Sequence, residues 1–312
     1  TPIDNPVFAT GDELEHNVVL GSENMYVLNP ASENTVTHLE NTIRELVENY
    51  DIDGIHFDDY FYPDDKAYYS LGENSNFKGH TFSTESLVDY ADYTNYLNNG
   101  GTLDLYNWRR SNVDNLIESL SVLIRNLNKE KTIPCAFGIS PSPFWAPAIE
   151  SCPAGSNRPA EGGMLSGCNN YYSYSDLYAN TKKWVEEEWI DYILPQAYTF
   201  LSNTYRDIVD WWTDVVKNTS VKLYAGTSLG SLEEWGSTST LEISHQIRYN
   251  NATQNAVEGY SLFSYKNLVN GLGEKGIKNV KSYNWKTNAL TPLYEKYTYQ
   301  NTVEDVAKVS SI

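Results

Sequence analysis

Basic side chains are scarce in this sequence, which has 22 Lys and Arg residues against 41 Asp and Glu residues and a formal net charge of −19. Proteins that bind nucleic acids or anionic membranes need basic patches to neutralise phosphate groups, so this balance argues against both partners. The chain also lacks any run of eighteen apolar residues, the length that a membrane-spanning helix requires. Its beginning, TPIDNPVFATGDELEHN, shows no signal peptide and resembles a mature or truncated start, which leaves secretion open.

Recognisable metal and cofactor motifs are absent as well. The cysteines and histidines show no CxxC or HxxxH spacing, so no metal and no cofactor are expected. Cys135 lies in the apolar run TIPCAFGIS and is predicted to be a buried thiol. Cys152 and Cys168 bracket a loop rich in Gly, Pro, Ser and Asn. A disulfide would close this loop in an oxidising compartment; two separate thiols are an equal alternative, and a zinc ion is a weaker one.

Several enzyme signatures are missing too. No strand is followed by GxGxxG or GxxxxGK[ST], so a doubly wound nucleotide-binding sheet has little support. Ser140 and Ser228 have no GxSxG elbow, which argues against a serine hydrolase. Aromatic residues, in contrast, are abundant, with 25 Tyr and 8 Trp. Rings with a polar tip often line surfaces that contact carbohydrate or protein, although ordinary packing accounts for many of them.

Amphipathic helices and apolar strands alternate along the chain. Five segments with helical periodicity each precede a strand-like run. The pairs are SENTVTHLENTIRELVENY with IDGIHF, WRRSNVDNLIESLSVLIRNLN with TIPCAFGIS, DLYANTKKWVEEEW with IDYILPQAY, YRDIVDWWTDVVKN with VKLYAGTS, and LEISHQIRYNNATQ with VEGYSLFSY. Apolar strands separated by helices predict a parallel α/β sheet with right-handed crossovers.

Two long insertions interrupt this alternation, at residues 61–107 and 141–176. Each follows a strand, at the end where a parallel sheet presents its carboxyl termini. Long loops gathered at that end are typical of the functional face of a (β/α)8 barrel. We therefore expect residues 1–292 to form a barrel-like domain and residues 293–312 to form a polar tail or linker.

Acidic residues crowd the run YDIDGIHFDDYFYPDD, residues 50–65. In a strand through GIHFDD, side chains alternate, so His56 and Asp58 share one face while Ile55 and Phe57 point toward the helices. Asp58 then lies at the strand end and is directed into the barrel, and Asp59 follows where the backbone leaves the strand. Two carboxylates at such a rim are what glycoside cleavage requires, because one attacks the sugar and the other protonates the departing oxygen.

Other interpretations of this acidic run are capping of the next element or binding of Ca²⁺. Asp64 and Asp65 are predicted to belong to a solvated loop, and Asp53 to the opposite, stabilising end of the barrel. The spacing does not fit an EF-hand loop, so a Ca²⁺-dependent scaffold is the weakest alternative.

Six motifs in order resemble the glycosyl hydrolase-like family ten: NYDIDGIHFDDYFYP, WRRSNV, FGISP followed by FW, WIDYILPQAY, DWW and GYSLFSY. The resemblance extends from about Met25 to Pro292. It implies a TIM-type (β/α)8 barrel, glycosidase activity and a location outside the cytoplasm, since the family is a bacterial secreted group that includes enzymes cutting peptide-free peptidoglycan glycan strands. The run DGIHFD is also similar to a strand of amylase-like barrels, which would make Asp58 the nucleophile of a retaining enzyme.

The chain departs from the family pattern at its start. In the family, three strand–helix units precede the DGIHFDDYFYP strand, and too few residues precede it here to form them. We therefore expect a barrel that lacks its first three strand–helix units, which either have been removed or are supplied by a second chain.

Further residues are candidates for substrate binding. Gln196 and Tyr198 lie on one face at a strand end and are suited to sugar hydroxyls, although Tyr198 is as well explained by packing. Trp145 is suited to stacking on a sugar ring, with core packing as its alternative. Tyr60 and Tyr62 flank the aspartates as walls of a sugar subsite.

Charged candidates complete the predicted site. Arg109 and Arg110 are predicted to open a helix, where the helix dipole disfavours a cation. A negatively charged partner, either a carboxylate of the site or an acidic group of the substrate, would then be needed to stabilise Arg109. A plain salt bridge to the nearby aspartates is its alternative. His56 is expected to hydrogen-bond to the substrate or to Asp58. The general acid is either Asp59, a loop residue such as Glu233 or Glu234, or a residue that this chain does not contain.

The sequence therefore favours a retaining glycoside hydrolase that acts on bacterial cell-wall or related polysaccharide, with Asp58 as nucleophile. The competing hypothesis is a catalytically silent carbohydrate-binding or surface-assembly module.

Overall fold

The computed structural model describes residues 18–22, 25–62, 90–148, 159, 162–164, 170–229, 242–251, 256–269, 278 and 280. Cys152, Cys168, Glu233 and Glu234, much of both predicted insertions, and the tail 293–312 lie outside these residues. The chain divides into two compact units. The first contains Thr1–Phe137 and Phe144–Ile190, and the second contains Gly138–Pro143 and Asp191–Ile312.

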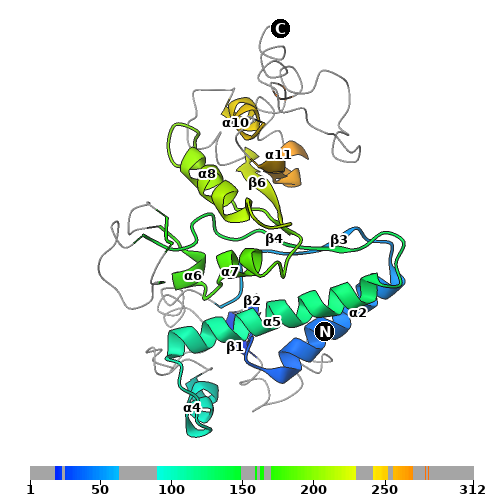
Figure 1. Ribbon diagram of the computed structural model, residues 1–312, viewed down its shortest axis with the longest axis vertical. Coiled ribbons are helices and arrows are strands. Elements are labelled where there is room, and N and C mark those ends of the chain that lie inside the picture. The colour runs from blue at the N-terminus through cyan, green and yellow to red at the C-terminus, as the bar shows by residue number, and fades with distance from the viewer. Residues whose placement is uncertain are drawn as a thin grey trace. The chain divides into compact units, whose positions relative to one another are not determined.

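All five predicted helix–strand pairs are present. The helices are α2 (Glu33–Asn49), α5 (Leu105–Asn128), α7 (Thr181–Glu186), α8 (Tyr205–Val216) and α10 (Glu242–Asn250). The strands that follow them are β3 (Gly54–Phe57), β4 (Ala136–Ile139), β5 (Tyr192–Ile193), β6 (Lys222–Ser228) and β7 (Val257–Phe263) (Figure 1). The prediction of an α/β fold is therefore confirmed.

The sheet follows the order of the sequence, β3-β4-β5-β6-β7. Strands β4 to β7 pair in parallel, with Gly138 opposite Tyr192 between β4 and β5 and Ser228 opposite Phe263 between β6 and β7. Doubly wound sheets reverse their strand order at a switch point, and this sheet has no reversal among its five strands. The order therefore argues against the doubly wound alternative.

Smaller elements accompany the alternating pairs. Strands β1 (Val18–Ser22) and β2 (Met25–Leu28) form an antiparallel pair. Helix α4 (Tyr90–Asn98) lies within the first predicted insertion, α6 (Ser173–Asp176) lies within the second, and α11 (Tyr265–Val269) follows β7. No described helix combines the length and the apolar character needed to cross a lipid bilayer.

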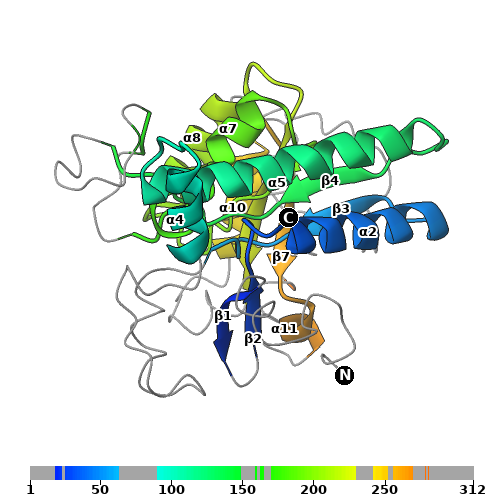
Figure 2. The same cartoon turned by 90° about the horizontal axis from the view of Figure 1, so that it is seen from below.

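Helices α2 and α5 begin at capping residues and pack side by side (Figure 2). The Ser32 side chain accepts a hydrogen bond from the Thr35 amide at 3.4 Å, and the Asp104 carboxylate accepts one from the Asn107 amide at 2.8 Å. These bonds satisfy amides that the first helical turn leaves without partners. The buried face of α5 repeats at helical spacing through Val113, Leu116, Ile117, Leu120 and Ile124.

The end of α5 is tied to β4 through a buried cysteine. The Asn128 side chain accepts a hydrogen bond from the Cys135 amide at 2.8 Å and donates one to the Cys135 carbonyl at 2.9 Å. Cys135 itself is fully buried, so the prediction of a buried thiol is confirmed. The next residue, Ala136, donates its amide to the Asp53 carbonyl at 2.8 Å, which places the start of β4 beside the start of β3.

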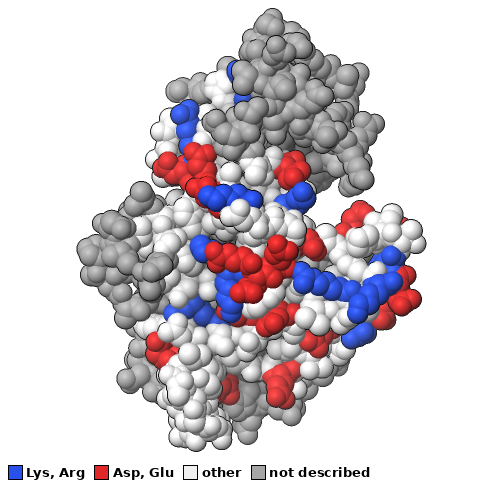
Figure 3. Space-filling view, viewed as in Figure 1, with Lys and Arg blue, Asp and Glu red and all other residues white. Residues whose placement is uncertain are grey.

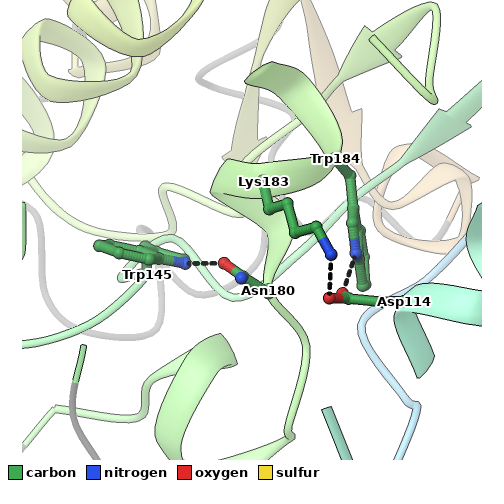
Figure 4. Close-up of polar contacts among 5 residues, drawn as sticks. All are labelled: Asp114, Trp145, Asn180, Lys183 and Trp184. Carbon is green, nitrogen blue, oxygen red and sulfur yellow. Dashed lines mark hydrogen bonds and ion pairs between the residues drawn. The ribbon is translucent and has the colours of Figure 1, made fainter. Parts of the chain in front are cut away.

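A buried carboxylate joins α5 to α7 (Figure 4). Asp114 accepts hydrogen bonds from the Trp184 indole at 2.7 Å and from Lys183 Nζ at 2.9 Å. Trp184 is fully buried, so its N–H has no access to water. Burial raises the pKa of Asp114, and the hydrogen bonds from Lys183 and Trp184 oppose this rise. The cluster fixes α7, and with it the loop that precedes α7.

In the second unit, Tyr205 at the start of α8 meets Asn250 at the end of α10. The Tyr205 hydroxyl lies 3.1 Å from Asn250 Oδ1 and 2.9 Å from Asn250 Nδ2, so the two buried side chains are hydrogen-bonded to each other. Burial raises the pKa of Tyr205 to about 12. The same unit buries the Trp212 ring, whose indole donates to the Pro143 carbonyl at 2.9 Å. These contacts hold α10 to α8 and α8 to the loop after β4.

Acidic and basic side chains are interspersed on the face that Figure 3 shows. Exposed ion pairs of the chain include Arg44 with Glu48 in α2 at 3.7 Å and Lys217 with Asp214 in α8 at 3.1 Å. Exposed pairs of this kind contribute little to stability.

Candidate active site

Strand β3 separates its side chains into a packed face and an open face. Ile55 is buried, and the Phe57 ring meets Phe137 edge-on with centroids 5.5 Å apart. His56 and Asp58, on the other face, are exposed. This alternation follows from the pleat of a strand. It leaves His56 and Asp58 accessible to a ligand.

The two predicted catalytic carboxylates lie in the turn that follows β3. Asp58 is exposed and Asp59 is half-buried. The Asp59 amide donates a hydrogen bond to Asp58 Oδ1 at 3.0 Å, which fixes the Asp58 carboxylate against the backbone. The carboxylate of Asp58 is therefore both oriented by the backbone and exposed at the end of β3.

The negative charges of Asp58 and Asp59 affect the pKa values of Tyr60 and His56. Tyr60 is 75% exposed, and its pKa is raised chiefly by the negative charge of Asp59, then by burial and by Asp58. The His56 imidazole is exposed but partly shielded by its surroundings, and this partial burial lowers its pKa, while Asp58 acts in the opposite direction. The neutral imidazole, which burial favours, has one nitrogen that donates and one that accepts a hydrogen bond. Asp58 is thus flanked by an imidazole and an exposed aromatic ring.

Tyr62 and Arg109 lie in the interior of the first unit. Both are about 1% exposed. The guanidinium of Arg109 lies over the Tyr62 ring at 5.6 Å and over the Tyr178 ring at 5.0 Å, and it donates to the Tyr178 hydroxyl at 3.1 Å. Tyr62 and Tyr178 also meet edge-on at 5.6 Å. The arrangement cross-links the β3 turn, α5 and the loop before α7.

The interpretation that Arg109 and Arg110 open a helix was wrong. Helix α5 starts at Leu105, within the predicted insertion 61–107, and its cap is Asp104. Both arginines therefore lie beyond the first turn, where the dipole effect has faded. Arg110 donates to the Tyr174 carbonyl at 3.1 Å and to Asn107 Oδ1 at 2.9 Å, and burial lowers its pKa. The electrostatic reason for expecting an acidic partner at Arg109 does not apply.

Trp145 is buried, with 4% of its surface exposed. Its indole donates to Asn180 Oδ1 at 3.2 Å (Figure 4), and its ring meets Tyr174 edge-on at 5.3 Å. Lys182 Nζ lies 5.6 Å from the ring centroid. This environment fits the packing alternative better than a sugar platform.

Gln196 and Tyr198 belong to the second unit, after β5. The Gln196 side chain donates to the Ser140 carbonyl at 2.9 Å, so it ties the loop after β5 to the loop after β4. Tyr198 is half-buried and stacks on Phe263, with ring centroids 5.4 Å apart. Their proposed roles as sugar contacts stay predictions.

Sequence reasoning missed Tyr178, Asn180 and the contacts of Asp114. Tyr178 has φ 56°, a left-handed conformation that is uncommon for a residue with a side chain and that nothing in the sequence announces. Asp114 did carry a signal, because it is an acidic residue beside the apolar stripe of an amphipathic helix. In the part of the chain that the structure describes, no group of three or more His, Cys, Asp and Glu residues lies close enough together to hold a metal ion.

A strand-end pair of aspartates on a parallel sheet is compatible with many enzymes, and comparison with known proteins narrows the choice. The model of the family glycosyl hydrolase-like 10 matches residues 5–238. The chain belongs to this family. Its relatives include the glycosyl hydrolase YngK of Bacillus subtilis, 34% identical over 242 residues and 75% of this chain. The glycosyl hydrolase DigH of Escherichia coli K12 is 30% identical over 216 residues and 68% of this chain.

The family match confirms the resemblance that the sequence motifs indicated and supports a glycosidase-like function. The motif GYSLFSY, residues 259–265, lies beyond the matched residues. The chain spans about two-fifths of each relative, 41% of YngK and 42% of DigH.

Proposed function

We propose that the chain acts as a retaining glycoside hydrolase on the glycan strands of bacterial cell walls or a related polysaccharide, outside the cytoplasm. The observation that carries the proposal is the pair Asp58 and Asp59 at the carboxyl end of β3, exposed and half-buried respectively, in a member of a glycosyl hydrolase-like family. Active sites of α/β barrels are built at the carboxyl ends of their strands. The unreversed order of the five strands supports the further proposal that they form part of such a barrel.

Asp58 has the role of nucleophile in this proposal. Its carboxylate attacks the anomeric carbon and forms a covalent glycosyl ester, while Asp59 gives a proton to the departing sugar oxygen. Asp59 then takes a proton from water, and the water oxygen attacks the anomeric carbon and releases Asp58. Asp59 is assigned the acid because it follows Asp58 directly where the chain leaves β3, so both carboxyl groups lie at the same strand end.

The neighbours of Asp58 support these roles. The hydrogen bond from the Asp59 amide keeps the Asp58 carboxylate in one orientation, which lowers the entropic cost of attack. His56, on the same exposed face as Asp58, is suited to hydrogen-bond a sugar hydroxyl, and the exposed Tyr60 ring offers a wall for the sugar. Tyr62 and Arg109 hold this turn in place from the interior, where they touch each other.

Digestion of peptide-free peptidoglycan glycan strands tests the proposed function. We expect shorter saccharides with new reducing ends, detected by mass spectrometry. Glycan binding with no new reducing ends, after prolonged incubation of the folded protein, would instead favour the carbohydrate-binding module. Absence of both binding and cleavage would contradict the choice of substrate class.

A further inference from the structure

Three aromatic side chains stand at the carboxyl ends of β5 and β7. Phe263, the last residue of β7, is 54% exposed, and Tyr265, the first residue of α11, is 78% exposed. Figure 2 shows β7 leading into α11. Tyr198, after β5, stacks on Phe263 with the ring planes inclined by 21°. Half-exposed rings gain only part of the free energy of burial, so folding alone is a weak reason for their position.

The backbone that carries Tyr198 is held on its amino-terminal side by the loop after β4. The Leu194 amide donates to the Ile139 carbonyl at 2.8 Å, and the Gln196 amide donates to the Pro141 carbonyl at 3.1 Å. The Gln196 side chain adds its hydrogen bond to the Ser140 carbonyl. These three bonds leave the segment before Tyr198 little freedom.

On the other side of Tyr198, helix α10 holds the chain. Gln246 Nε2 donates to the Thr199 carbonyl at 2.9 Å, and the Leu201 amide donates to Glu242 Oε1 at 2.6 Å. Gln246 is fully buried and also bonds Glu242 at 2.9 Å. The backbone that carries Tyr198 is therefore held on both sides, and Phe263 lies in β7 opposite Ser228 of β6. A rigid backbone lets a side chain contact a ligand without losing affinity to ordering of the chain.

We propose that Tyr198 and Phe263 form a platform on which a pyranose ring of a glycan strand stacks, with Tyr265 as a neighbouring contact. The proposal rests on the glycoside hydrolase function and assigns a carbohydrate contact to the second unit. Phe263 offers an uncharged, exposed ring, which matches the apolar C–H face of a pyranose. Tyr198 and Tyr265 each add a hydroxyl beside the rings. These hydroxyls can hydrogen-bond the polar edge of a sugar whose apolar face stacks on a ring. Neither ring depends on Asp58 for its position.

Binding of peptide-free glycan strands to the full chain, measured by isothermal titration calorimetry in an Asp58→Asn background, tests the platform. Phe263→Leu keeps an apolar side chain of similar reach but removes the flat ring, so we expect Kd to rise about tenfold. Phe263→Trp keeps a flat ring and should bind within about twofold of the background protein. Thermal unfolding of each variant verifies that the fold is kept.

Tyr50 provides the matched control, because it is 55% exposed but lies after α2, before β3. Tyr50→Ala is expected to leave Kd unchanged. Binding of Phe263→Leu that equals the background, or no binding by the background protein, would overturn the platform. The proposed function fails separately, if Asp58→Asn still releases reducing ends. A Kd that rises equally for Phe263→Leu and Phe263→Trp would also count against stacking.

Discussion

Replacing Asp58 with Asn is expected to lower the turnover of glycan strands by about 10³-fold or more, a loss of about 4 kcal/mol in transition-state stabilisation. The amide of Asn has no negative charge with which to attack the anomeric carbon. Its oxygen can still accept the hydrogen bond that the Asp59 amide now donates to Asp58 Oδ1, so the turn after β3 should keep its shape. Release of reducing ends measures the activity, and thermal unfolding measures the fold.

Asp53→Asn is the control for this substitution. Asp53 is exposed and lies before β3, at the end of the strand opposite to Asp58. Removal of its charge should change turnover by less than about twofold, because long-range effects of exposed charges are screened by salt. An Asp58→Asn protein that turns over glycan strands at the original rate would remove Asp58 from the mechanism.

Asp114→Ala is expected to lower the free energy of unfolding by about 2–3 kcal/mol. The substitution leaves the indole N–H of Trp184 buried without its acceptor at 2.7 Å. Lys183 loses its partner too, but its side chain is 40% exposed and can turn to water, which limits the loss. Asp114→Asn keeps an oxygen for Trp184 and should lose about half as much. Urea denaturation followed by tryptophan fluorescence provides the values.

Asp214→Ala is the control for this substitution. It removes an exposed carboxylate, with 74% of its side chain accessible, and should change the free energy of unfolding by less than about 0.5 kcal/mol.

The stability contributed by Asp114 depends on pH. The pKa of Asp114 is raised in the folded protein, so the folded state binds the proton of this carboxyl group more tightly than the unfolded state does. The contribution of Asp114 to stability is therefore greatest below pH 3.8 and falls as the pH rises through the raised pKa.

The pH dependence gives a sharp comparison with Asp114→Asn, which does not titrate. The difference in unfolding free energy between the unmodified protein and Asp114→Asn should narrow as the pH rises from 3.8. A difference that widens with pH would show that the pairing with Lys183 outweighs the cost of burying the carboxylate.

The alternation of helices and strands was predictable because it follows from local patterns. Apolar residues at helical spacing in α2 and α5 and the short apolar runs of β3 and β4 each record burial within one element. The faces of β3 could be assigned in the same way, since strict alternation places Ile55 and His56 on opposite sides. A barrel closes by the pairing of strands that are distant in the sequence, and local patterns carry no signal for such pairing.

The surroundings of the candidate side chains could not be predicted, because they come from residues far along the chain. Arg109 is enclosed with Tyr178, and Trp145 bonds Asn180, both through the loop before α7. The sequence identified which aromatic and polar residues are candidates for the site, but it did not reveal which of their side chains are buried and which are exposed to solvent. The stacked pair of Tyr198 and Phe263 likewise requires β5 and β7 to be brought together by the sheet.

Covalent trapping tests the central claim, that Asp58 is the nucleophile, most directly. A glycosyl fluoride that carries a second fluorine at C2 reacts with a retaining enzyme but releases the ester slowly, so the glycosyl-enzyme accumulates. Peptide mapping by mass spectrometry is predicted to find one added glycosyl unit on Asp58, and none in the Asp58→Asn protein. A glycosyl unit on another carboxylate, or cleavage that inverts the anomeric configuration, would contradict the account.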